Sequence, residues 1–513
     1  MDNAAPLKGN SLVLGTIALS LATFMNVLDT SIANVSLSAI AGDLGVSPEQ
    51  GTWVITSFAV ANAISLPLTG WLTQRFGQVK LFTASVLMFV LASLACGLAP
   101  SIELLIFFRI VQGFVAGPMI PLSQTMLLSS YPKEKAGTAL ALWSMTTLVA
   151  PVAGPLLGGW ITDNISWPWI FYINVPVGIA AAAVTWSIYA KRETATRKIP
   201  IDGVGLGLLV LWVSSLQVML DKGKDLDWFH SGMIVTLAVV AAFAFALFVV
   251  WELTEKHPVV DLRLFKSRNF TIGVVALTLA YGVFFGNLVL LPMWLQQYMG
   301  YTATLAGMAL APVGILAIVL SPLVGKNVAK VDVRILTTIS FATFAIVMYM
   351  RSQFNAQVDF TTIMVPTIVQ GAAVAFFFIP LVTLTLSGIE PAQMPSASGL
   401  SNFARITGGA IGTSLSTTIW DHRATQHHAQ LAEHLSAYDP TTVQALAQMQ
   451  AGGMTQDQSW AALNQMVNQQ AAILSATDIF YASSILFVML IGVVWLAKPK
   501  KAAGGGAEAA GAH

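Results

Sequence analysis

The chain has 513 residues, of which 56% are hydrophobic and only 10% are charged. A soluble domain carries about 25% charged residues, so this composition excludes an ordinary soluble protein and predicts an all-α, polytopic membrane protein. The formal net charge of +1 gives no indication of a nucleic-acid partner, and the single cysteine, Cys96, excludes an intrachain disulfide.

Apolar runs of about 17 to 25 residues, long enough to cross a bilayer as helices, recur along the chain. The shortest is 335–350, and a polar loop joins 203–220 to 232–251. Fourteen spans are predicted, an even number that places both termini on one side. They are 12–36, 51–72, 81–99, 104–128, 138–161, 168–190, 203–220, 232–251, 270–295, 304–324, 335–350, 361–387, 396–419 and 479–497.

The lysines and arginines predict which side the termini occupy. One set of alternating loops, together with the two tails, holds most of the 25 basic residues. The opposite loops hold only Lys222, Lys224, Arg351 and Arg423. Because basic residues are retained on the cytoplasmic side, both termini are expected in the cytoplasm.

Asp29 is a carboxylate inside the first apolar span. A charge in the bilayer is costly, so the default interpretation is functional, and a proton carrier is expected. The alternative is an acid that hydroxyls and amides such as Asn26 or Thr30 hold in place for packing alone. Arg109 and Arg405 also lie within apolar spans, and each is predicted either to take part in proton coupling or to pin helices together.

The segment 150–159 contains five helix-breaking residues within an apolar span. In a bilayer such a helix can persist, since neighbouring helices satisfy the backbone groups that proline frees and glycine permits close approach. We therefore predict a deformable gate that seals the two halves of the molecule. Its residues are Pro151, Gly154, Pro155, Gly158 and Gly159.

Three short segments recur in the same order 255 to 258 residues later, which predicts two related halves. The repeat pairs Asp29 with Asn287 and Arg109 with Thr367, so each of these two charges is expected to lack a charged counterpart in the other half. The predicted units are a six-helix bundle at 1–200, an inserted helix pair at 201–262, a second six-helix bundle at 263–498 and a cytoplasmic tail at 499–513. The recurring pairs are Ala18–Ala22 with Ala276–Ala280, Ser65–Gly70 with Leu320–Gly325, and Ile110–Gly113 with Ile368–Gly371.

The region 420–478 is the long extramembrane segment, and the topology places it outside the cytoplasm. It is rich in Gln and Ala, and helical stretches are expected, with the last span beginning as a helix that projects beyond the bilayer. Two interpretations of this segment remain: it docks a partner protein, or it is a solvated loop that binds no partner. Its histidines, with few acids nearby, are not expected to bind a metal.

Aromatic, Met and polar residues in the spans are candidates for a substrate cavity, against the alternative of lipid-facing or core positions. The chain lacks a phosphate-binding GxxxxGK[ST] loop and the HExxH metal motif, so no cofactor is expected and the proton-motive force is the predicted energy source. The cavity candidates are Asn34, Gln112, Trp143, Met145, Tyr281, Asn287, Gln370 and Phe377.

Several of these motifs together resemble the major facilitator superfamily, and within it the fourteen-helix drug:proton antiporters. Gly154–Gly159 matches the antiporter signature of the fifth span, and Leu28–Val35 matches the motif of the first. Arg109, with Gln112 and Gly113, is similar to the proton-coupling motif of the fourth span.

The loop after the second span also resembles a family signature, through Gly70, Arg75, Gly77 and Lys80. Gln74 stands where the family has an aspartate, which puts in doubt the charge network that latches the cytoplasmic gate.

The resemblance covers almost the whole chain and is strongest to the inner-membrane components of tripartite multidrug efflux systems. It implies two six-helix bundles with two inserted helices, and export of lipophilic compounds by alternating access. It also implies a bacterial inner membrane, a periplasmic adaptor of the membrane-fusion type and, through it, an outer-membrane channel.

Two alternatives remain open. One is a proton-coupled importer or facilitator of a nutrient, which the Gly-Pro signature disfavours. The other is a non-transport membrane scaffold or enzyme, which is disfavoured because the spans contain no convincing nucleophile, metal or acid–base set.

Overall fold

The computed structural model describes residues 6–132, 135–198, 200–433, 435–436 and 438–498, and within these ranges the regular elements are all helical. The predicted tail at 499–513 lies outside the described residues. The helices are α1 (Gly9–Val35), α2 (Leu37–Asp43), α3 (Pro48–Gly51), α4 (Trp53–Ser65), α5 (Thr69–Phe76), α6 (Gln78–Gly97), α7 (Ile102–Ala116), α8 (Met119–Ser130), α9 (Ala136–Asn164), α10 (Trp169–Tyr172), α11 (Asn174–Tyr189), α12 (Gly203–Lys222), α13 (Gly232–Thr254), α14 (Arg268–Tyr298), α15 (Ala303–Leu310), α16 (Val313–Asn327), α17 (Val333–Arg351), α18 (Phe360–Thr385), α19 (Met394–Glu433), α20 (Pro440–Ala451) and α21 (Gln456–Trp495).

The helices confirm a multi-pass membrane protein. Among the described residues, 11 helices are long and apolar enough to cross a bilayer, or 12 when the bent pair α4–α5 counts as one. The spans predicted at 138–161 and 396–419 coincide with α9 and α19. The number of fourteen membrane crossings stays a prediction.

Prolines mark the points where the long spans break. Pro67 separates α4 from α5, which meet at an angle of 62°. Pro118 lies between α7 and α8, and Pro312 between α15 and α16. Proline has no backbone N–H and its ring clashes with the preceding turn, which accounts for these three breaks, although other prolines, such as Pro292 and Pro380, lie inside continuous helices.

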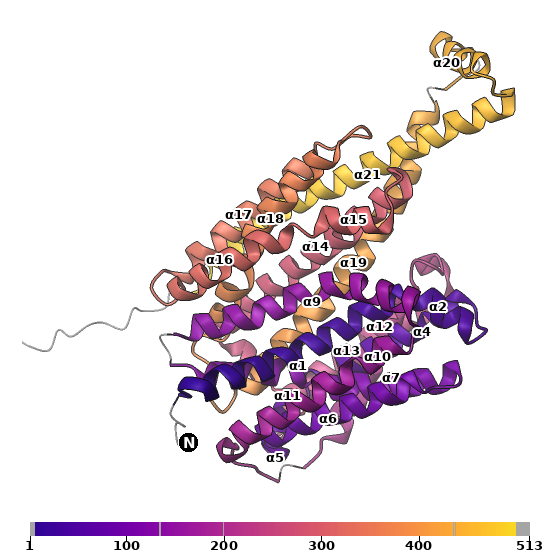
Figure 1. Ribbon diagram of the computed structural model, residues 1–513. Coiled ribbons are helices and arrows are strands. Elements are labelled where there is room, and N and C mark those ends of the chain that lie inside the picture. Colours follow the sequence, from indigo (N-terminus) through magenta and orange to yellow (C-terminus); the bar gives the residue numbers. More distant parts are fainter. Residues whose placement is uncertain (1–5, 133–134, 199, 434, 437, 499–513) are drawn as a thin grey trace, which may run out of the picture.

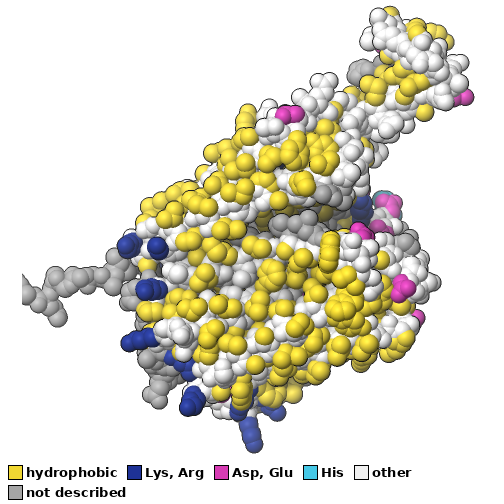
Figure 2. All heavy atoms as spheres, viewed as in Figure 1, with side chains coloured by type: hydrophobic (Ala, Val, Ile, Leu, Met, Phe, Trp, Pro, Cys, Tyr) yellow, Lys and Arg dark blue, Asp and Glu magenta, His cyan; other side chains and the backbone are white. Residues whose placement is uncertain are grey.

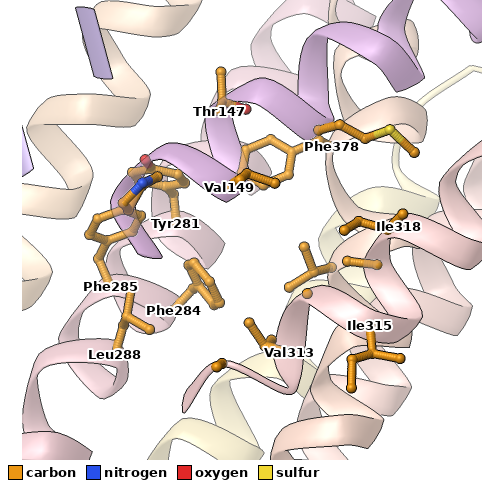
Figure 3. Close-up of a pocket in the computed structure, with 16 residues that line it drawn as sticks. Thr147, Val149, Tyr281, Phe284, Phe285, Leu288, Val313, Ile315, Ile318 and Phe378 are labelled. Carbon is orange, nitrogen blue, oxygen red and sulfur yellow. The ribbon is translucent and has the colours of Figure 1, made fainter. Parts of the chain in front are cut away.

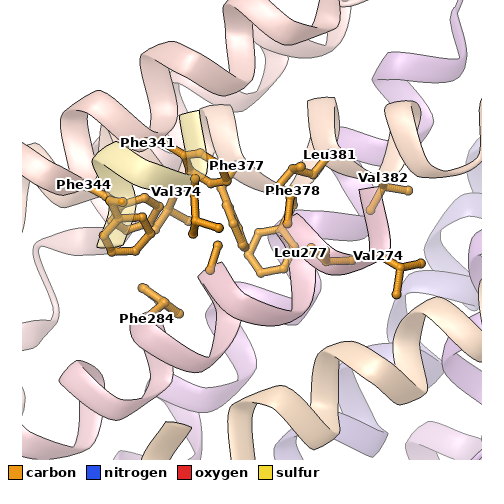
Figure 4. Packing of buried hydrophobic residues seen from close by; sticks show 14 of the residues in the cluster. Val274, Leu277, Phe284, Phe341, Phe344, Val374, Phe377, Phe378, Leu381 and Val382 are labelled. Carbon is orange, nitrogen blue, oxygen red and sulfur yellow. The ribbon is translucent and has the colours of Figure 1, made fainter. Parts of the chain in front are cut away.

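The early and late helices pack as two groups (Figure 1). In the first, which we call the N-terminal half, α1 contacts α8, α9 and α11; in the second, the C-terminal half, α14 contacts α18, α19 and α21. Buried apolar side chains follow the same division, because two clusters draw only on residues before 190 and the largest draws mainly on residues after 200. Figure 4 shows the aromatic centre of the largest cluster, formed by residues such as Phe341, Phe344 and Phe377. The proposed domain boundaries themselves stay predictions.

Lysine and arginine gather at the end of the bundle where α1 begins, and acidic residues at the opposite end, on the face that Figure 2 shows. We call the first the basic end. The two halves approach closely near it through small residues. A Cβ on Gly137 of α9 would lie 2.1 Å from the carbonyl oxygen of Gly325 on α16, and one on Gly399 would lie 2.7 Å from the carbonyl oxygen of Leu66. Gly70 meets Ser396 with similar closeness. Glycine at these positions therefore permits backbone contact between the halves.

The inserted helix α12 runs along the junction between the halves, in contact with α4 and α19. At the end away from the basic one, Thr56 donates to Asp221 at 2.6 Å, and Ser414 donates to the carbonyl of Leu220 at 2.9 Å. Farther along, the Trp228 indole donates to Thr418. The insert is thus bonded to both halves.

The C-terminal parts of α19 and the N-terminal part of α21 form a hairpin that projects from the bundle, with α20 at its tip (Figure 1). The Trp420 indole donates to the carbonyl of Ala472 at 2.9 Å, and Asp478 pairs with Arg423 and His427. The expected helical stretches and the projecting start of the last span are confirmed.

Candidate functional site

Asp29 lies at the centre of a polar cluster inside the N-terminal half. Its carboxylate is 0% exposed and accepts hydrogen bonds from three side chains. Arg109 Nη1 lies 2.5 Å from Oδ2, while Gln112 Nε2 and Asn174 Nδ2 lie 3.1 and 2.9 Å from Oδ1. The partners come from α7 and α11, so the acid joins three helices. We call these four residues the N-half cluster.

Arg109 is held as tightly as the acid. Its Nε donates to the carbonyl of Val54 at 3.0 Å, and Nη1 also donates to Gln112 Oε1 at 2.7 Å. The guanidinium carbon lies 4.2 Å from the centre of the Phe58 ring, within the range of a cation–π interaction. A buried arginine needs an anion, and Asp29 supplies it. The structure therefore brings together the two charges that the sequence singled out.

Asn174 and Ser93 belong to this site but were missed as candidates. Asn174 bridges Asp29 and Ser93 Oγ, with distances of 2.9 and 3.0 Å. Cys96 Sγ contacts Gln112 Oε1 at 3.6 Å. Uncharged polar residues are frequent in membrane helices and are therefore a weak signal. The only sequence feature that could have indicated the role of Asn174 is its polar side chain at the start of an apolar run.

The C-terminal half contains a corresponding cluster. Asn287, Thr367 and Gln370 lie 258 residues after Asp29, Arg109 and Gln112, and Arg351 lies 258 residues after Ser93. Arg351 Nη2 donates to Gln370 Oε1 at 2.7 Å and to Thr367 Oγ1 at 3.2 Å. Asn287 donates to Ser483 at 2.9 Å. We call Asn287, Arg351, Thr367 and Gln370 the C-half cluster.

Arg351 corrects the assignment made from the sequence. We expected it in a loop, because it follows directly on the apolar run 335–350. In the structure it is the last residue of α17, and its side chain is 1% exposed. The counterparts of Asp29 and Arg109 are uncharged, as expected, but Arg351 brings a positive charge to this cluster from another helix.

Arg405 on α19 is also buried, but its environment differs from that of Arg109. Its guanidinium donates to Asn402 at 2.9 Å and lies 4.6 Å from the centre of the Tyr281 ring. The ring of Phe378 is 5.8 Å away. A role in proton coupling for Arg405 stays a prediction.

A cavity of about 300 Å³ lies between α9 of the N-terminal half and α14, α16 and α18 of the C-terminal half. Figure 3 shows Val149 of α9, Phe284 of α14 and Val313 of α16 around it. The lining is predominantly apolar, which suits a lipophilic ligand. The lining residues are Met145, Thr147, Val149, Pro151, Tyr281, Phe284, Phe285, Leu288, Ala311, Val313, Gly314, Ile315, Ala317, Ile318, Val374 and Phe378.

Two of the eight cavity candidates, Met145 and Tyr281, line this space. Trp143 instead donates to Ser123 at 3.1 Å, and Phe377 packs in the core against Phe344. Asn34 is exposed on α1. The remaining three, Gln112, Asn287 and Gln370, lie in the two polar clusters. Residue type alone did not distinguish cavity from core because both are apolar.

The glycines of the 150–159 run face α1, within the same half. A Cβ on Gly154 would lie 2.0 Å from Ser31 Oγ, and one on Gly158 would lie 2.7 Å from Ile32 Cγ1. Gly159 has more room, and Pro151 lines the cavity. The side chain of Pro155 lies outside the described residues.

This arrangement differs from the expected seal between the halves. Gly154 and Gly158 pack against α1, which carries Asp29, whereas α9 meets the other half at Gly137 and, across the cavity, at Pro151. The helix α9 is continuous from Ala136 to Asn164. A gating role for the run stays a prediction.

The motif at 70–80 lies at the basic end. Gly77 adopts φ +89°, a conformation that favours glycine. Glu193, which the sequence did not single out, accepts from the backbone N–H groups of Val79 and Lys80 at 3.0 and 2.8 Å and so caps α6. Arg75 lies 5.6 Å from the ring of Trp71. A carboxylate is therefore present beside the loop despite Gln74.

Comparison with known sequences gives a consistent result along the whole chain. The family model described as the Major Facilitator Superfamily matches residues 19–413. The multidrug export protein EmrB of Escherichia coli (strain K12) is 53% identical over 514 residues, which cover 100% of both chains. The fatty acid resistance protein FarB of Neisseria gonorrhoeae is 51% identical, covering 98% of this chain and 99% of the relative.

Solved structures share the fold at low sequence identity. The human organic anion transporter MFSD10 aligns with a TM-score of 0.61 at 11% identity, covering 95% of this chain and 100% of its own. The proton:xylose symporter XylE aligns with a TM-score of 0.57 at 14% identity, covering 94% and 95%. These similarities concern the arrangement of helices alone.

Proposed function

The chain belongs to the major facilitator superfamily of membrane transporters, and on that premise we propose that it is a proton-driven exporter of lipophilic toxic compounds. Full-length similarity to proteins named for multidrug export supports this direction of transport. The apolar cavity between the halves supports a lipophilic substrate. The chain would lie in a bacterial inner membrane with both termini in the cytoplasm.

The observation that carries the proposal is the buried Asp29–Arg109 pair. The carboxylate can exist with or without a proton, whereas arginine keeps its charge. Protonation of Asp29 removes the negative charge that attracts Arg109 Nη1 at 2.5 Å and leaves the guanidinium with neutral partners. The pair thus has two electrostatic states that a proton selects. Because Asp29 lies on α1, which packs on α9, a change at the acid reaches the wall of the cavity.

Alternating access requires that the cavity open to one side at a time. In this structure the halves are in contact near the basic end, through pairs such as Gly137 with Gly325. We propose that a proton reaches Asp29, and the substrate is released, while the halves are in contact near the basic end. In the other conformation of the transport cycle this contact opens. One proton that moves inward across 100 mV supplies about 2.3 kcal/mol.

Transport in proteoliposomes with an imposed pH gradient tests the coupling. Asp29→Asn keeps the shape of the side chain but cannot carry a proton, so we expect at least a tenfold loss of gradient-driven efflux of a lipophilic dye. Asp163→Asn is the matched control, because Asp163 is an exposed acid at the end of α9. Gradient-driven efflux by Asp29→Asn at the wild-type rate would remove this acid from the mechanism.

We also propose that the projecting hairpin binds a periplasmic adaptor, and through it an outer-membrane channel. The hairpin extends from the end opposite the basic one and exposes residues such as Tyr438 and Met454. Replacement of 435–455 by a short Gly/Ser linker should leave dye efflux in proteoliposomes unchanged and abolish drug resistance in whole cells. Resistance that persists in cells with the shortened hairpin would contradict the docking role.

A further inference from the structure

Arg351 carries a buried positive charge without an acidic partner among the described residues. Its guanidinium bonds only to Thr367 and Gln370, both neutral, and its side chain is 1% exposed. Arg109 in the other half is buried to the same degree but is paired with Asp29. Desolvation of an unpaired ion costs several kcal/mol in a protein. The C-terminal end of α17, where Arg351 lies, offsets only about 0.3–1 kcal/mol of that cost.

Hydrogen-bond donors around Arg351 also lack partners. Arg351 Nε and Gln370 Nε2 are buried and make no hydrogen bond to the described residues. Buried donors are normally satisfied, and an unsatisfied one costs about 1–3 kcal/mol. One acceptor of the cluster, Asn287 Oδ1, is also buried without a partner, but it is neutral, so the positive charge of Arg351 stays uncompensated.

We infer that the C-half cluster is an anion-binding site, in which Arg351 and Gln370 hold a single monovalent anion of the size of a halide or a carboxylate. Such a ligand supplies both the missing negative charge and the missing acceptors. In the N-terminal half a protein carboxylate, Asp29, has this role. In the C-terminal half the corresponding residue is Asn287, and a bound anion replaces the acid.

Two cavities have lining residues that are close in the chain to the cluster. At the end away from the basic one, a solvent-open cavity of about 510 Å³ is lined by Met350 and Pro366, the chain neighbours of Arg351 and Thr367. On the other side, Gln370 lies one helical turn from Val374, which lines the cavity between the halves. The anion can thus come from solution as a halide or from the substrate as its carboxylate.

Ligand-dependent thermal unfolding of the purified full-length chain in detergent tests the site. Sodium chloride is titrated at constant ionic strength against sodium 2-morpholinoethanesulfonate, a bulky anion that is neither a halide nor a carboxylate. In a second arm 4-phenylbutyrate is compared with its neutral amide. Binding to the folded state alone raises the midpoint in a saturable way. We expect such a rise for the wild type and for Arg334→Gln, an arginine on the same helix that is paired with Asp332. We expect Arg351→Gln to lose the rise.

The two arms identify the source of the anion. A rise with chloride assigns a halide, and a rise with phenylbutyrate but neither with its amide nor with chloride assigns a substrate carboxylate. If Arg351→Gln does not fold, Gln370→Leu retains the charge and should raise the apparent Kd by about tenfold or more. The inference is overturned if neither anion shifts the wild-type midpoint, or if the shift persists in the folded variants at wild-type affinity. The readout is binding, so its outcome is independent of the proposed export.

Discussion

In the N-terminal half the buried arginine is Arg109 on α7, and its guanidinium contacts the carboxylate of Asp29. In the C-terminal half the buried arginine is Arg351 on α17, and its partners are a hydroxyl and an amide. The two clusters occupy corresponding positions of a duplicated chain. In the C-half cluster, however, the arginine lies on a helix that does not correspond to α7, and Asn287 stands where the N-half cluster has its acid. Only the first cluster can change its charge by taking up a proton. The two polar sites correspond in position, and differences at three paired positions, Asp29 with Asn287, Ser93 with Arg351 and Arg109 with Thr367, make them electrically different.

The largest effect is expected when Asp29 is replaced by asparagine, the residue at the corresponding position 287, because this removes the main difference between the two clusters. Asp29→Asn leaves Arg109 buried with neutral partners, and we expect the free energy of unfolding to fall by about 3–5 kcal/mol. Arg109→Met should cost less, because the carboxyl left behind can take up a proton. Denaturant unfolding in detergent micelles measures both. A larger loss for Arg109→Met than for Asp29→Asn would contradict the assigned charge states.

Glycines pack closely against α1, which carries Asp29, and against α14, which carries Asn287, so substitutions at these glycines test the two halves separately. A Cβ on Gly154 would meet Ser31 of α1 at 2.0 Å, and a Cβ on Gly412 would meet the carbonyl of Gly282 on α14 at 2.1 Å. Valine at either position should cost about 1–3 kcal/mol of stability through overpacking. Only Gly154→Val should also impair proton-coupled efflux, because α1 carries Asp29.

A matched control for this pair is Gly159→Val, since the nearest atom to a Cβ at Gly159 is 3.8 Å away. We expect it to change stability by less than about 0.5 kcal/mol. Equal loss of coupling in Gly154→Val and Gly412→Val would show that the two halves contribute alike.

A smaller effect is expected when the charge of the second cluster is removed. In a medium with the bulky sulfonate 2-morpholinoethanesulfonate as the sole anion, Arg351→Met should change stability by less than about 1 kcal/mol or increase it, because the charge it removes is uncompensated. Unfolding by denaturant in the same micelles measures this. A loss of the size expected for Asp29→Asn would mean that Arg351 has a stabilising partner in the protein itself.

The smallest effect is expected far from both clusters. Arg423 pairs with Asp478 on the partly exposed hairpin, and surface ion pairs contribute about 0–1 kcal/mol. Arg423→Gln should therefore leave dye efflux in proteoliposomes at the wild-type rate and lower the unfolding midpoint only slightly. Impaired efflux in that assay would connect the hairpin to the N-half cluster.

The sequence was sufficient for the helices and for singling out Asp29 and Arg109, because a carboxylate or guanidinium in an apolar run is rare and energetically costly, but it left their pairing open. It did not identify Asn174 or Glu193, since amides in spans and acids in loops are common. Arg351 was misplaced because hydropathy defines the end of a span only to within a residue or two, and one residue decides whether its side chain is buried.

The Gly/Pro run illustrates a different limit. Its composition indicated close helix contact, but not which helix makes it. The contact proved to be with Ser31 and Ile32 of the same half. Partner choice depends on the three-dimensional arrangement of helices, which a repeat of five or six residues does not specify.

The continuous helix α21 has a mechanical consequence. Its 40 residues run from the tip of the hairpin to the basic end, where Trp495 donates to Thr338. At 1.5 Å per residue the helix is about 60 Å long. A tilt of the whole helix by about 10° about one end would therefore displace its other end by about 10 Å. A protein bound at the tip of the hairpin would thus be connected through α21 to the C-terminal half at the basic end, and could limit or promote its movement there.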